Sequence, residues 1–217
     1  MSKLIALTFD DGPNTDTTLD VLEKLKKYDV VATFFLIADA INDRSAESVK
    51  KAIAMGCEIE NHSKTHSYMD QLDEQTIKDE IKYTSEKIFE ITGRMPEFFR
   101  PPYINVNETM VQAIDLPFIC GHGGRDWEPD CPTDERASLI LNAVSDGSII
   151  LLHDMSGNDK TVAALDIIIP ELQKQGYEFV TVSQIFIRKG ITPTVHSGIV
   201  YSDVTQTIRF DDPNYEG

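Results

Sequence analysis

Apolar and polar positions along the chain form two kinds of segment. Short runs rich in β-branched and aromatic residues, typical of buried strands, occupy 3–9, 32–37, 58–60, 98–100, 118–121, 148–152 and 177–182. Longer stretches with the apolar spacing of helices occupy 16–28, 45–55, 73–92, 107–114, 134–145, 161–175 and 183–188. Because the two kinds alternate, the pattern predicts an α/β protein with βα units around a parallel sheet or barrel.

The helix expected at 73–92 shows its buried face most clearly. Ile77, Ile81, Ile88 and Ile91 fall on one stripe, and charged residues occupy the other faces. This helix is therefore expected to cover a core.

The helical spacing ends at Gly190. Residues 191–217 are richer in Thr, Ser, Asp and Pro, which favours an extended segment laid over the rest of the protein. A length of 217 residues fits one domain. We expect a single domain over residues 1–190 with a C-terminal extension, 191–217, packed on it.

Composition excludes some classes of protein. The chain is 41% hydrophobic and 26% charged, which is ordinary for a globular protein with a full core. Its 36 acidic and 20 basic residues give a net charge of -16, so nucleic acid and anionic membranes are not expected as partners. The three cysteines are odd in number and lack metal-site spacing, so no disulfide framework is expected. Nothing in the sequence indicates the oligomeric state.

The first residues indicate the compartment only conditionally. The chain contains no apolar run long enough for a transmembrane helix. Residues 1–7 lead into a strand pattern without the apolar core and cleavage site of a signal peptide. The sequence as written thus predicts a cytoplasmic protein, or a secreted or cell-surface one if a leader has been removed.

Two carboxylates follow the first strand. Asp10 and Asp11 are delivered onto a loop that Gly12 and Pro13 close. Adjacent residues at a strand end point in different directions, so one carboxylate can bind a metal ion while the other acts as a general base. An ordinary Asp-Gly-Pro turn is the alternative for this motif taken alone.

His62 and His66 are four residues apart. They would share one face if the segment turned helically, as two ligands of one ion do. An isolated pair at this spacing is more often a surface or core feature, but Asp11 completes an open metal site. Imidazole and carboxylate ligands favour zinc, with cobalt, nickel and manganese as alternatives.

Two further motifs carry the other groups that a hydrolysis needs. Arg100 begins an Arg-Pro-Pro-Tyr motif, and His153 follows the apolar run 149–152. A nearby carboxylate would keep His153 charged, and Asp126 is the candidate. Taken alone, each of these motifs is equally consistent with a strand-ending cap or an anchored loop.

Together these motifs resemble the polysaccharide deacetylases of the NodB homology type, carbohydrate esterase family 4. The matching residues, in family order, are 8–13, 62–66, 100–103, 126–127 and 151–154. The resemblance covers nearly the whole chain. It implies a distorted (β/α)7 barrel and the metal-dependent removal of acetyl groups from carbohydrate.

The resemblance also implies a role for each residue. Asp10 is the general base, Asp11, His62 and His66 hold the metal ion, and His153 is the general acid that protonates the departing oxygen or nitrogen.

A second group supports these residues and the substrate. Arg100 orients the base, Asp126 tunes the acid, and the backbone N–H of Tyr103 helps to hold the oxyanion. The implied substrate-lining residues are Pro102, Trp127 and Leu151.

One segment that differs from the common family pattern indicates the substrate class. Residues 119–124, Ile-Cys-Gly-His-Gly-Gly, stand where many members carry a Trp and an additional Asp. A glycine-rich variant is similar to that of acetylxylan esterases, so we expect O-deacetylation of acetylated xylan. The alternatives are an N-deacetylase of peptidoglycan or chitin oligomers, and a non-catalytic carbohydrate-binding protein. The presence of Asp10, Arg100, Asp126 and His153 together argues against a non-catalytic binding protein, because ligand binding alone requires none of them.

Three residues near the motifs have less defined roles. His122 is expected to be a solvated bystander, because no partner for it is evident. Tyr68 and Met69 either line a glycan groove or anchor their turn against the core.

Overall fold

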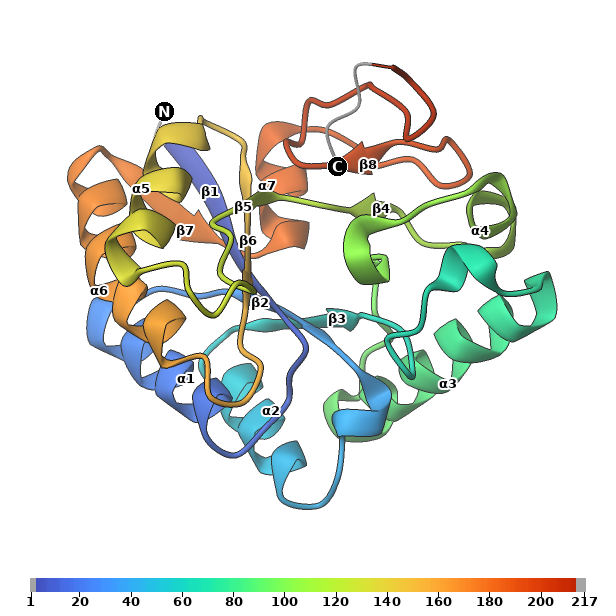
Figure 1. The fold of residues 1–217 in the computed structure, drawn as a ribbon, viewed down its shortest axis with the longest axis horizontal. Coiled ribbons are helices and arrows are strands. Elements are labelled where there is room, and N and C mark those ends of the chain that lie inside the picture. The colour runs from blue at the N-terminus through green and yellow to red at the C-terminus, as the bar shows by residue number, and fades with distance from the viewer. Residues whose placement is uncertain (1–2, 214–217) are drawn as a thin grey trace.

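A parallel sheet forms the centre of the structure, a computed structural model that describes residues 3–213 (Figure 1). Its hydrogen-bonded order is β3 (Glu58–Asn61), β2 (Thr33–Leu36), β1 (Lys3–Asp10), β6 (Ile149–His153) and β5 (His122–Gly123), and β7 (Tyr177–Val180) also pairs with β1. All these pairs are parallel, so the carboxyl ends of the strands meet at one edge. The predicted α/β class is confirmed.

The central strand β1 changes partners along its length. Residues Lys3 to Ala6 pair with β7, whereas Thr8 to Asp10 pair with β2. Because Ala6 also pairs with β6, β7 and β2 must share the opposite edge of β1. This change of partner distorts the regular succession of a barrel.

Helices surround the sheet (Figure 1). They are α1 (Thr17–Tyr28), α2 (Ser45–Ala54), α3 (Glu74–Thr92), α4 (Glu108–Ala113), α5 (Thr133–Ala143), α6 (Asp159–Lys174) and α7 (Val182–Lys189). Each end lies within two residues of its predicted position. Short 3-10 helices cover Ala38–Ala40, Met69–Gln71 and Pro102–Ile104. Among residues 3–213, no helix is both long and apolar enough to cross a bilayer.

Side chains of β1 alternate between two apolar clusters. Ile5, Leu7 and Phe9 pack in the cluster that includes residues of α1, α2 and α6. Leu4 and Ala6 pack in the cluster that includes residues of α7. The strand is buried on both faces, as expected for a parallel strand between layers. This burial fixes the position of its carboxyl end, where Asp10 lies.

Two predicted strands differ from the structure. The run 98–100 forms only isolated bridges at Phe99. Of the run 118–121 only β4 (Phe118–Ile119) forms a strand; Gly121, with a φ of 151°, separates it from β5 (His122–Gly123). A Cβ atom at Gly121 would lie 2.9 Å from that of Leu151, so only glycine allows this close approach.

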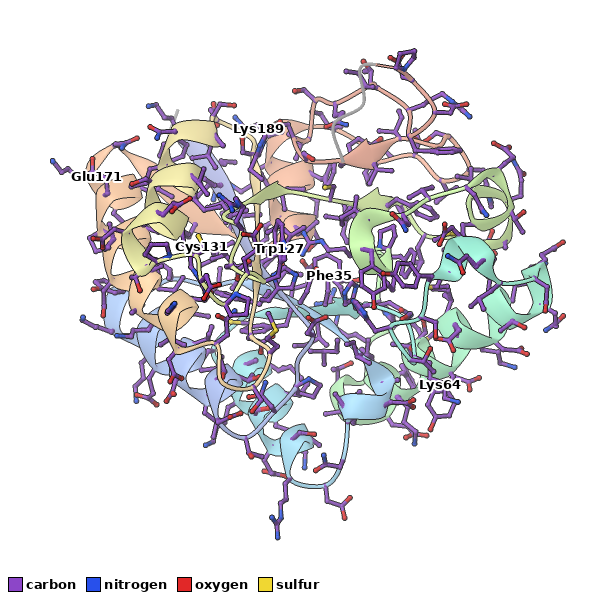
Figure 2. The ribbon with its side chains drawn as sticks, in the orientation of Figure 1. Phe35, Lys64, Trp127, Cys131, Glu171 and Lys189 are labelled. Atoms are coloured by element: carbon purple, nitrogen blue, oxygen red, sulfur yellow. The ribbon has the colours of Figure 1, made fainter. Side chains whose placement is uncertain are left out.

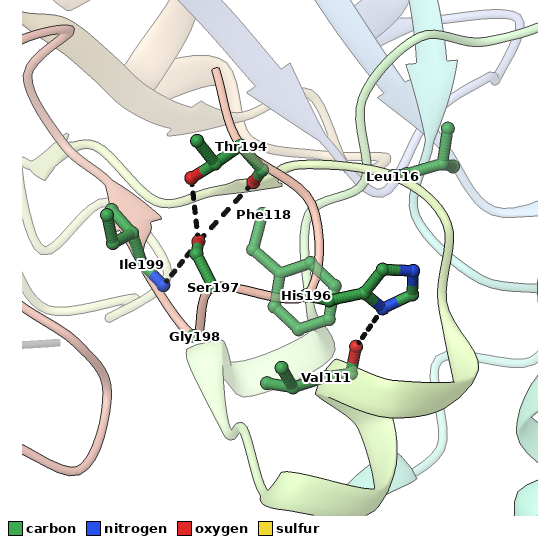
Figure 3. Close-up of a pocket in the computed structure, with 8 residues that line it drawn as sticks. All are labelled: Val111, Leu116, Phe118, Thr194, His196, Ser197, Gly198 and Ile199. Atoms are coloured by element: carbon green, nitrogen blue, oxygen red, sulfur yellow. Dashed lines mark hydrogen bonds between the residues drawn. The ribbon is translucent and has the colours of Figure 1, made fainter.

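The chain after Gly190 packs on the domain through β8 (Val200–Tyr201), which pairs with β4. Figure 3 shows His196 beside α4, with its Nδ1 atom 2.8 Å from the carbonyl oxygen of Val111. The space between these segments is only about 10 Å³, so it is a packing contact and not a ligand site. Residues 214–217 of the expected extension lie outside the described part.

Candidate active site

The parallel register places two of the predicted residues at the same edge of the sheet. Asp10, the last residue of β1, lies opposite His153, the last residue of β6. Both side chains line a cleft of about 490 Å³ at the carboxyl ends of the strands. Figure 2 shows Trp127, another residue of this cleft, near the centre of the view together with Phe35.

An irregular loop carries the two histidines. Ser63 and His66 have positive φ angles of 67° and 58°, so the helical turn on which they were expected is wrong. The Asn61 side chain accepts the N–H of Ser63 at 2.8 Å, and the Ser63 hydroxyl accepts the N–H of His66 at 3.0 Å. These local hydrogen bonds replace the backbone bonds that a helix would supply.

Glu80 on α3 also holds this loop. Its carboxylate is 8% exposed and accepts the backbone N–H groups of Lys64 and Thr65, each at 2.9 Å. No motif of the sequence pointed to Glu80 as a functional residue. Its signal was an acidic side chain beside the apolar stripe of α3, next to Ile77 and Ile81.

We predict that Glu80→Gln lowers the affinity of the site for a divalent cation by about tenfold, because the loop that carries His62 and His66 loses a charged acceptor. Titration of the metal-free protein with zinc, followed by calorimetry, measures this. Glu86→Gln changes an exposed carboxylate on the same helix and is the matched control. Equal affinities in Glu80→Gln and the parent would show that the loop is ordered without Glu80.

Asp11, His62 and His66 converge. The Asp11 Oδ1 atom lies 3.4 Å from the Nε2 atom of each histidine, and the ligand atoms all lie within 4.8 Å of one another. His62 Nδ1 is 2.7 Å from the carbonyl oxygen of Arg100, which can only accept, so the proton is on Nδ1 and Nε2 is free to coordinate. This spacing suits one divalent cation.

The electrostatics of these groups also fit a cation. Asp11 Oδ1 is buried and has no hydrogen-bond donor among residues 3–213. Burial raises the pKa of Asp11, but His62, His153 and His66 outweigh it and lower the pKa to about 2. Burial and His62 lower the pKa of His66, which favours its neutral, coordinating form. An ionised carboxylate oxygen without a donor, between two imidazoles, is a position that a cation satisfies.

Arg100 fixes Asp10 beside this cluster. Its Nη1 donates to Asp10 Oδ1 at 2.6 Å and its Nη2 to the carbonyl of Cys120 at 2.5 Å. Arg100 is fully buried and lies 4.1 Å from the ring centre of Phe35. Asp10 Oδ2 lies 3.8 Å from His62 Nε2, at the edge of the candidate metal site. Arg100 therefore holds Asp10 next to the candidate metal site, and Asp11 lies closer to the two histidines than Asp10 does.

Asp126 holds His153 on the other side of the cleft. Its Oδ1 lies 2.8 Å from His153 Nδ1, and its Oδ2 accepts the backbone N–H of His153 at 2.7 Å. Burial alone would lower the pKa of His153, but Asp126, with Asp10 and Asp11, raises it to about 9. The imidazole is thus charged at neutral pH, with Nε2 left for a ligand in the cleft.

The walls of the cleft are largely apolar. Leu151 and Tyr103 line it, and Trp127, 50% exposed, packs edge to face against His153 with ring centres 5.8 Å apart. Pro101 lines the cleft, whereas Pro102, which the sequence analysis placed there, is buried and is not among its lining residues. Tyr103 adopts a φ of 59°, which turns the chain away from Pro102 at this point.

His122, Met69 and Tyr68, whose roles the sequence left open, have different surroundings in the structure. His122 is half-buried on β5, and its Nε2 lies 3.0 Å from Asp203 Oδ2, so the expectation of a solvated bystander is wrong. Its partner comes from the C-terminal segment and has no local sequence signal. Met69 is buried, whereas Tyr68 is 47% exposed and stacks on Tyr103 with ring centres 4.0 Å apart.

The geometry defines a class of site. A candidate cation site of Asp11, His62 and His66 lies between an arginine-bound carboxylate and a charged imidazole, at the carboxyl ends of parallel strands. A carboxylate base and an imidazolium acid on either side of a Lewis acid are the groups that metal-dependent hydrolysis of an ester or amide requires.

Comparisons with known proteins agree with this class. The polysaccharide deacetylase family model matches residues 1–116. The chain is 50% identical over 193 residues to a bifunctional xylanase/deacetylase of Pseudobutyrivibrio xylanivorans, covering 89% of this chain and 32% of that protein. It is 40% identical over 191 residues to a peptidoglycan-N-acetylglucosamine deacetylase of Bacillus cereus, covering 84% of this chain and 88% of that protein. The chain therefore belongs to the polysaccharide deacetylase family, carbohydrate esterase family 4.

Solved structures show the same fold. The Xyl-CE4 domain of a multidomain xylanase from the hindgut metagenome of Trinervitermes trinervoides superposes with a TM-score of 0.91 at 47% identity, covering 94% of this chain and 98% of that one. A family 4 acetyl xylan esterase from Clostridium thermocellum, in complex with a cobalt ion, gives 0.90 at 41% identity, covering 94% and 100%. The expected distorted (β/α)7 barrel in a single domain is confirmed. The chain spans about a third of the xylanase/deacetylase.

Proposed function

We propose that this chain removes O-acetyl groups from acetylated xylan or its oligosaccharides. One observation carries the proposal: a single cleft joins the candidate cation site, the Asp10 and His153 side chains, and an apolar wall of Leu151 and Trp127. A carbonyl carbon held in this cleft has a base on one side and a proton donor on the other, and the wall accepts an acetyl methyl group.

Asp10 acts first in the proposed reaction. Its carboxylate takes a proton from the water that attacks the acetyl carbonyl, and the hydrogen bond from Arg100 keeps it oriented for this step. A divalent cation, proposed to be zinc and held by Asp11, His62 and His66, supplies Lewis-acid polarisation and lowers the pKa of the water. Cobalt, nickel or manganese also suits these ligands.

His153 completes the reaction. It gives the proton from Nε2 to the departing sugar oxygen, while Asp126 stabilises the imidazolium from the other side. The backbone N–H of Tyr103 is proposed to donate to the oxyanion, a contribution typically worth about 3 kcal/mol. Trp127 and Leu151 enclose the acetyl methyl group.

The chemistry of the cleft supports a neutral glycan as the substrate. None of its lining residues is Lys or Arg, so beyond the reacting His153 and the candidate metal site a carboxylate-bearing chain such as peptidoglycan finds no cation in the cleft. Identity is 50% to the xylanase/deacetylase and 34% to 40% to several peptidoglycan-N-acetylglucosamine deacetylases. An N-deacetylase of chitin oligomers or peptidoglycan is the second candidate.

Acetate release from acetylated xylan, N-acetylchito-oligosaccharides and peptidoglycan by the metal-loaded protein tests the substrate. We expect kcat/KM to be highest on xylan. Release confined to N-acetyl substrates would contradict the proposal. The third candidate, a binding protein without turnover, is realistic because one neighbour, 29% identical with a TM-score of 0.76, is described as a mutant of a CE4 family pseudoenzyme with restored activity. Glycan binding without acetate release would support it.

The tyrosine stack at the rim of the cleft gives a further prediction. Tyr68 and Tyr103 are each about half exposed and nearly coplanar, with 12° between their rings. Against such a face a sugar ring packs with its apolar side. We predict that Tyr68→Ala raises KM for acetylated xylan about fivefold and leaves kcat on 4-nitrophenyl acetate unchanged.

Phe89→Ala is the matched control for Tyr68→Ala, because Phe89 is an aromatic residue on α3 that is 50% exposed. Metal content is measured in both variants, since Tyr103 also packs against His66 with ring centres 4.6 Å apart. Loss of metal in Tyr68→Ala would assign Tyr68 to support of His66 in place of sugar binding.

A further inference from the structure

Arg136 on α5 is a buried cation whose direct partners are all neutral. The residue is 1% exposed. Its guanidinium donates to the carbonyls of Cys131 at 3.0 Å and Glu128 at 2.9 Å, to Asn158 Oδ1 at 2.6 Å and to Thr161 Oγ1 at 2.8 Å. A buried guanidinium is costly unless an anion compensates its charge. The anion that compensates Arg136 therefore lies beyond its direct hydrogen-bond partners.

The compensating anion is the carboxylate of Asp126, which is reached through Thr161 and Asn158. The Thr161 hydroxyl donates to Asp126 Oδ2 at 3.0 Å. Asn158 Nδ2 donates to the carbonyl oxygen of His153 at 3.0 Å and reaches Asp126 Oδ2 at 3.5 Å. Asp126 is itself 1% exposed. The two buried charges thus form an ion pair bridged by a hydroxyl and an amide.

The direction of these hydrogen bonds is determined by Arg136. A guanidinium has donors only, so Asn158 must turn its oxygen toward Arg136 and its NH₂ group toward Asp126 and the His153 carbonyl. For the same reason the Thr161 hydroxyl accepts from Arg136 and uses its single hydrogen for Asp126. Without the guanidinium, both side chains could reverse and present acceptors to the carboxylate.

The consequence for His153 follows from the carboxylate's geometry. Asp126 Oδ2 accepts from Thr161 and from the His153 backbone N–H, which leaves Oδ1 for His153 Nδ1. The charged groups that face His153 are Asp126 and, from the end of β1, Asp10 and Asp11. Only Asp126 among these is held by the Arg136 network.

We propose that Arg136 is a positioning residue for the proton donor: acting through Thr161 and Asn158, it holds Asp126 as an acceptor and so keeps His153 with Nδ1 protonated and Nε2 toward the cleft. This inference rests on the proposed role of His153 as general acid. Arg136 itself does not line the active-site cleft.

The test compares two leaving groups. A sugar alkoxide must be protonated as it leaves, whereas the nitrophenolate of 4-nitrophenyl acetate leaves without a proton donor. We expect Thr161→Val, which removes the bridging hydroxyl at nearly constant volume, to lower kcat on acetylated xylo-oligosaccharides about tenfold and to change kcat on 4-nitrophenyl acetate less than about twofold. Arg136→Met is expected to show the same selectivity, and Thr161→Ser, which keeps the hydroxyl, to restore the sugar activity.

Thr84→Val is the matched control. Thr84 is a fully buried threonine on α3 whose hydroxyl donates to the backbone of its own helix, at the carbonyl of Glu80. It should leave the ratio of the two activities unchanged. Equal losses on both substrates in Thr161→Val would show a merely structural role. Full activity on both substrates would show that the bridge does not act on the proton donor. Either result overturns the proposal.

A second readout does not depend on turnover. Proton NMR of the parent should show a downfield signal from His153 Nδ1–H bonded to Asp126, assigned by its loss in His153→Gln. In Arg136→Met and Thr161→Val this signal should move upfield or vanish. An unchanged signal in both variants overturns the proposal. Failure of the parent to release acetate from any glycan would refute the proposed function instead, and this signal would still decide the role of Arg136.

Discussion

Asp10→Ala is expected to keep the metal ion and to lose about 10³-fold or more in kcat on acetylated xylan. The side chain removed is the proposed base, whereas the candidate cation site consists of Asp11 and the two histidines. Among the carboxylates of residues 3–213, only that of Asp11 has an oxygen, Oδ1, within 3.4 Å of both imidazole Nε2 atoms. Metal analysis of the purified variant, alongside kcat, separates the two functions of the adjacent aspartates.

Asp10→Ala also removes the carboxylate partner of the buried Arg100, so a second variant is needed as a control. Asp10→Ala leaves the guanidinium of Arg100 buried without its carboxylate, which typically destabilises a protein by about 3–5 kcal/mol. Asp10→Asn keeps an oxygen acceptor for Arg100 and should be equally inactive. His66→Ala should show the opposite pattern, with reduced metal affinity. Loss of metal in Asp10→Asn would mean that the roles of Asp10 and Asp11 are reversed.

Asp126→Asn is expected to lower kcat on acetylated xylan and to shift its pH dependence. In the parent, burial acts to lower the pKa of His153, but Asp126, with Asp10 and Asp11, outweighs it, so the pKa is about 9. Because the imidazolium is the proposed proton donor, activity should persist at neutral pH and fall as the pH rises through about 9. With a neutral amide at position 126, only Asp10 and Asp11 remain to oppose burial, so the pKa of His153 should fall from its parent value.

The measurement is the pH profile of kcat in the parent and in Asp126→Asn. At pH 8 we expect the variant to lose about 10²-fold on acetylated xylan, and its alkaline limb should lie below that of the parent. On 4-nitrophenyl acetate the loss should be small, because nitrophenolate needs no acid. Coincident alkaline limbs in the two proteins would contradict the assignment of Asp126 to His153.

Most of the secondary structure followed from the sequence because its elements are long and strongly patterned. In the predicted stripe on α3, Ile77 and Ile88 are fully buried, and Ile81 and Ile91 are partly buried against the core. The two-residue strands β5 and β8 were not predicted, since two residues carry no periodicity. Pairing of β8 with β4 joins segments about eighty residues apart, which a local pattern does not encode.

The candidate site was predicted as a set of residue types at strand ends, and the parallel register explains why these residues lie together in the structure. Motifs that follow parallel strands must meet at one edge, so Asp10 and His153 come together although they are far apart in the sequence. The supporting residues were not predictable in the same way. Glu80, Arg136 and Thr161 come from helices, and their roles depend on which loop or carboxylate each helix approaches.

Local backbone conformation explains the errors at the site. Ser63 and His66 are left-handed, which propensity does not favour, and the hydrogen bonds of Asn61 and Glu80 stabilise that conformation. Pro101, and not Pro102, lines the cleft because the chain here changes from the extended backbone of Pro101 to a short 3-10 helix that begins at Pro102. A one-residue shift of this kind cannot be read from a motif.

Metal dependence is measured as acetate release from acetylated xylan by the chelated protein, before and after addition of zinc. We expect no release before addition, and release restored in the parent and in Glu86→Gln but not in His66→Ala at limiting zinc. Release by the fully chelated parent, or an equal response in His66→Ala, would contradict a metal-dependent deacetylase whose cation is held by Asp11, His62 and His66.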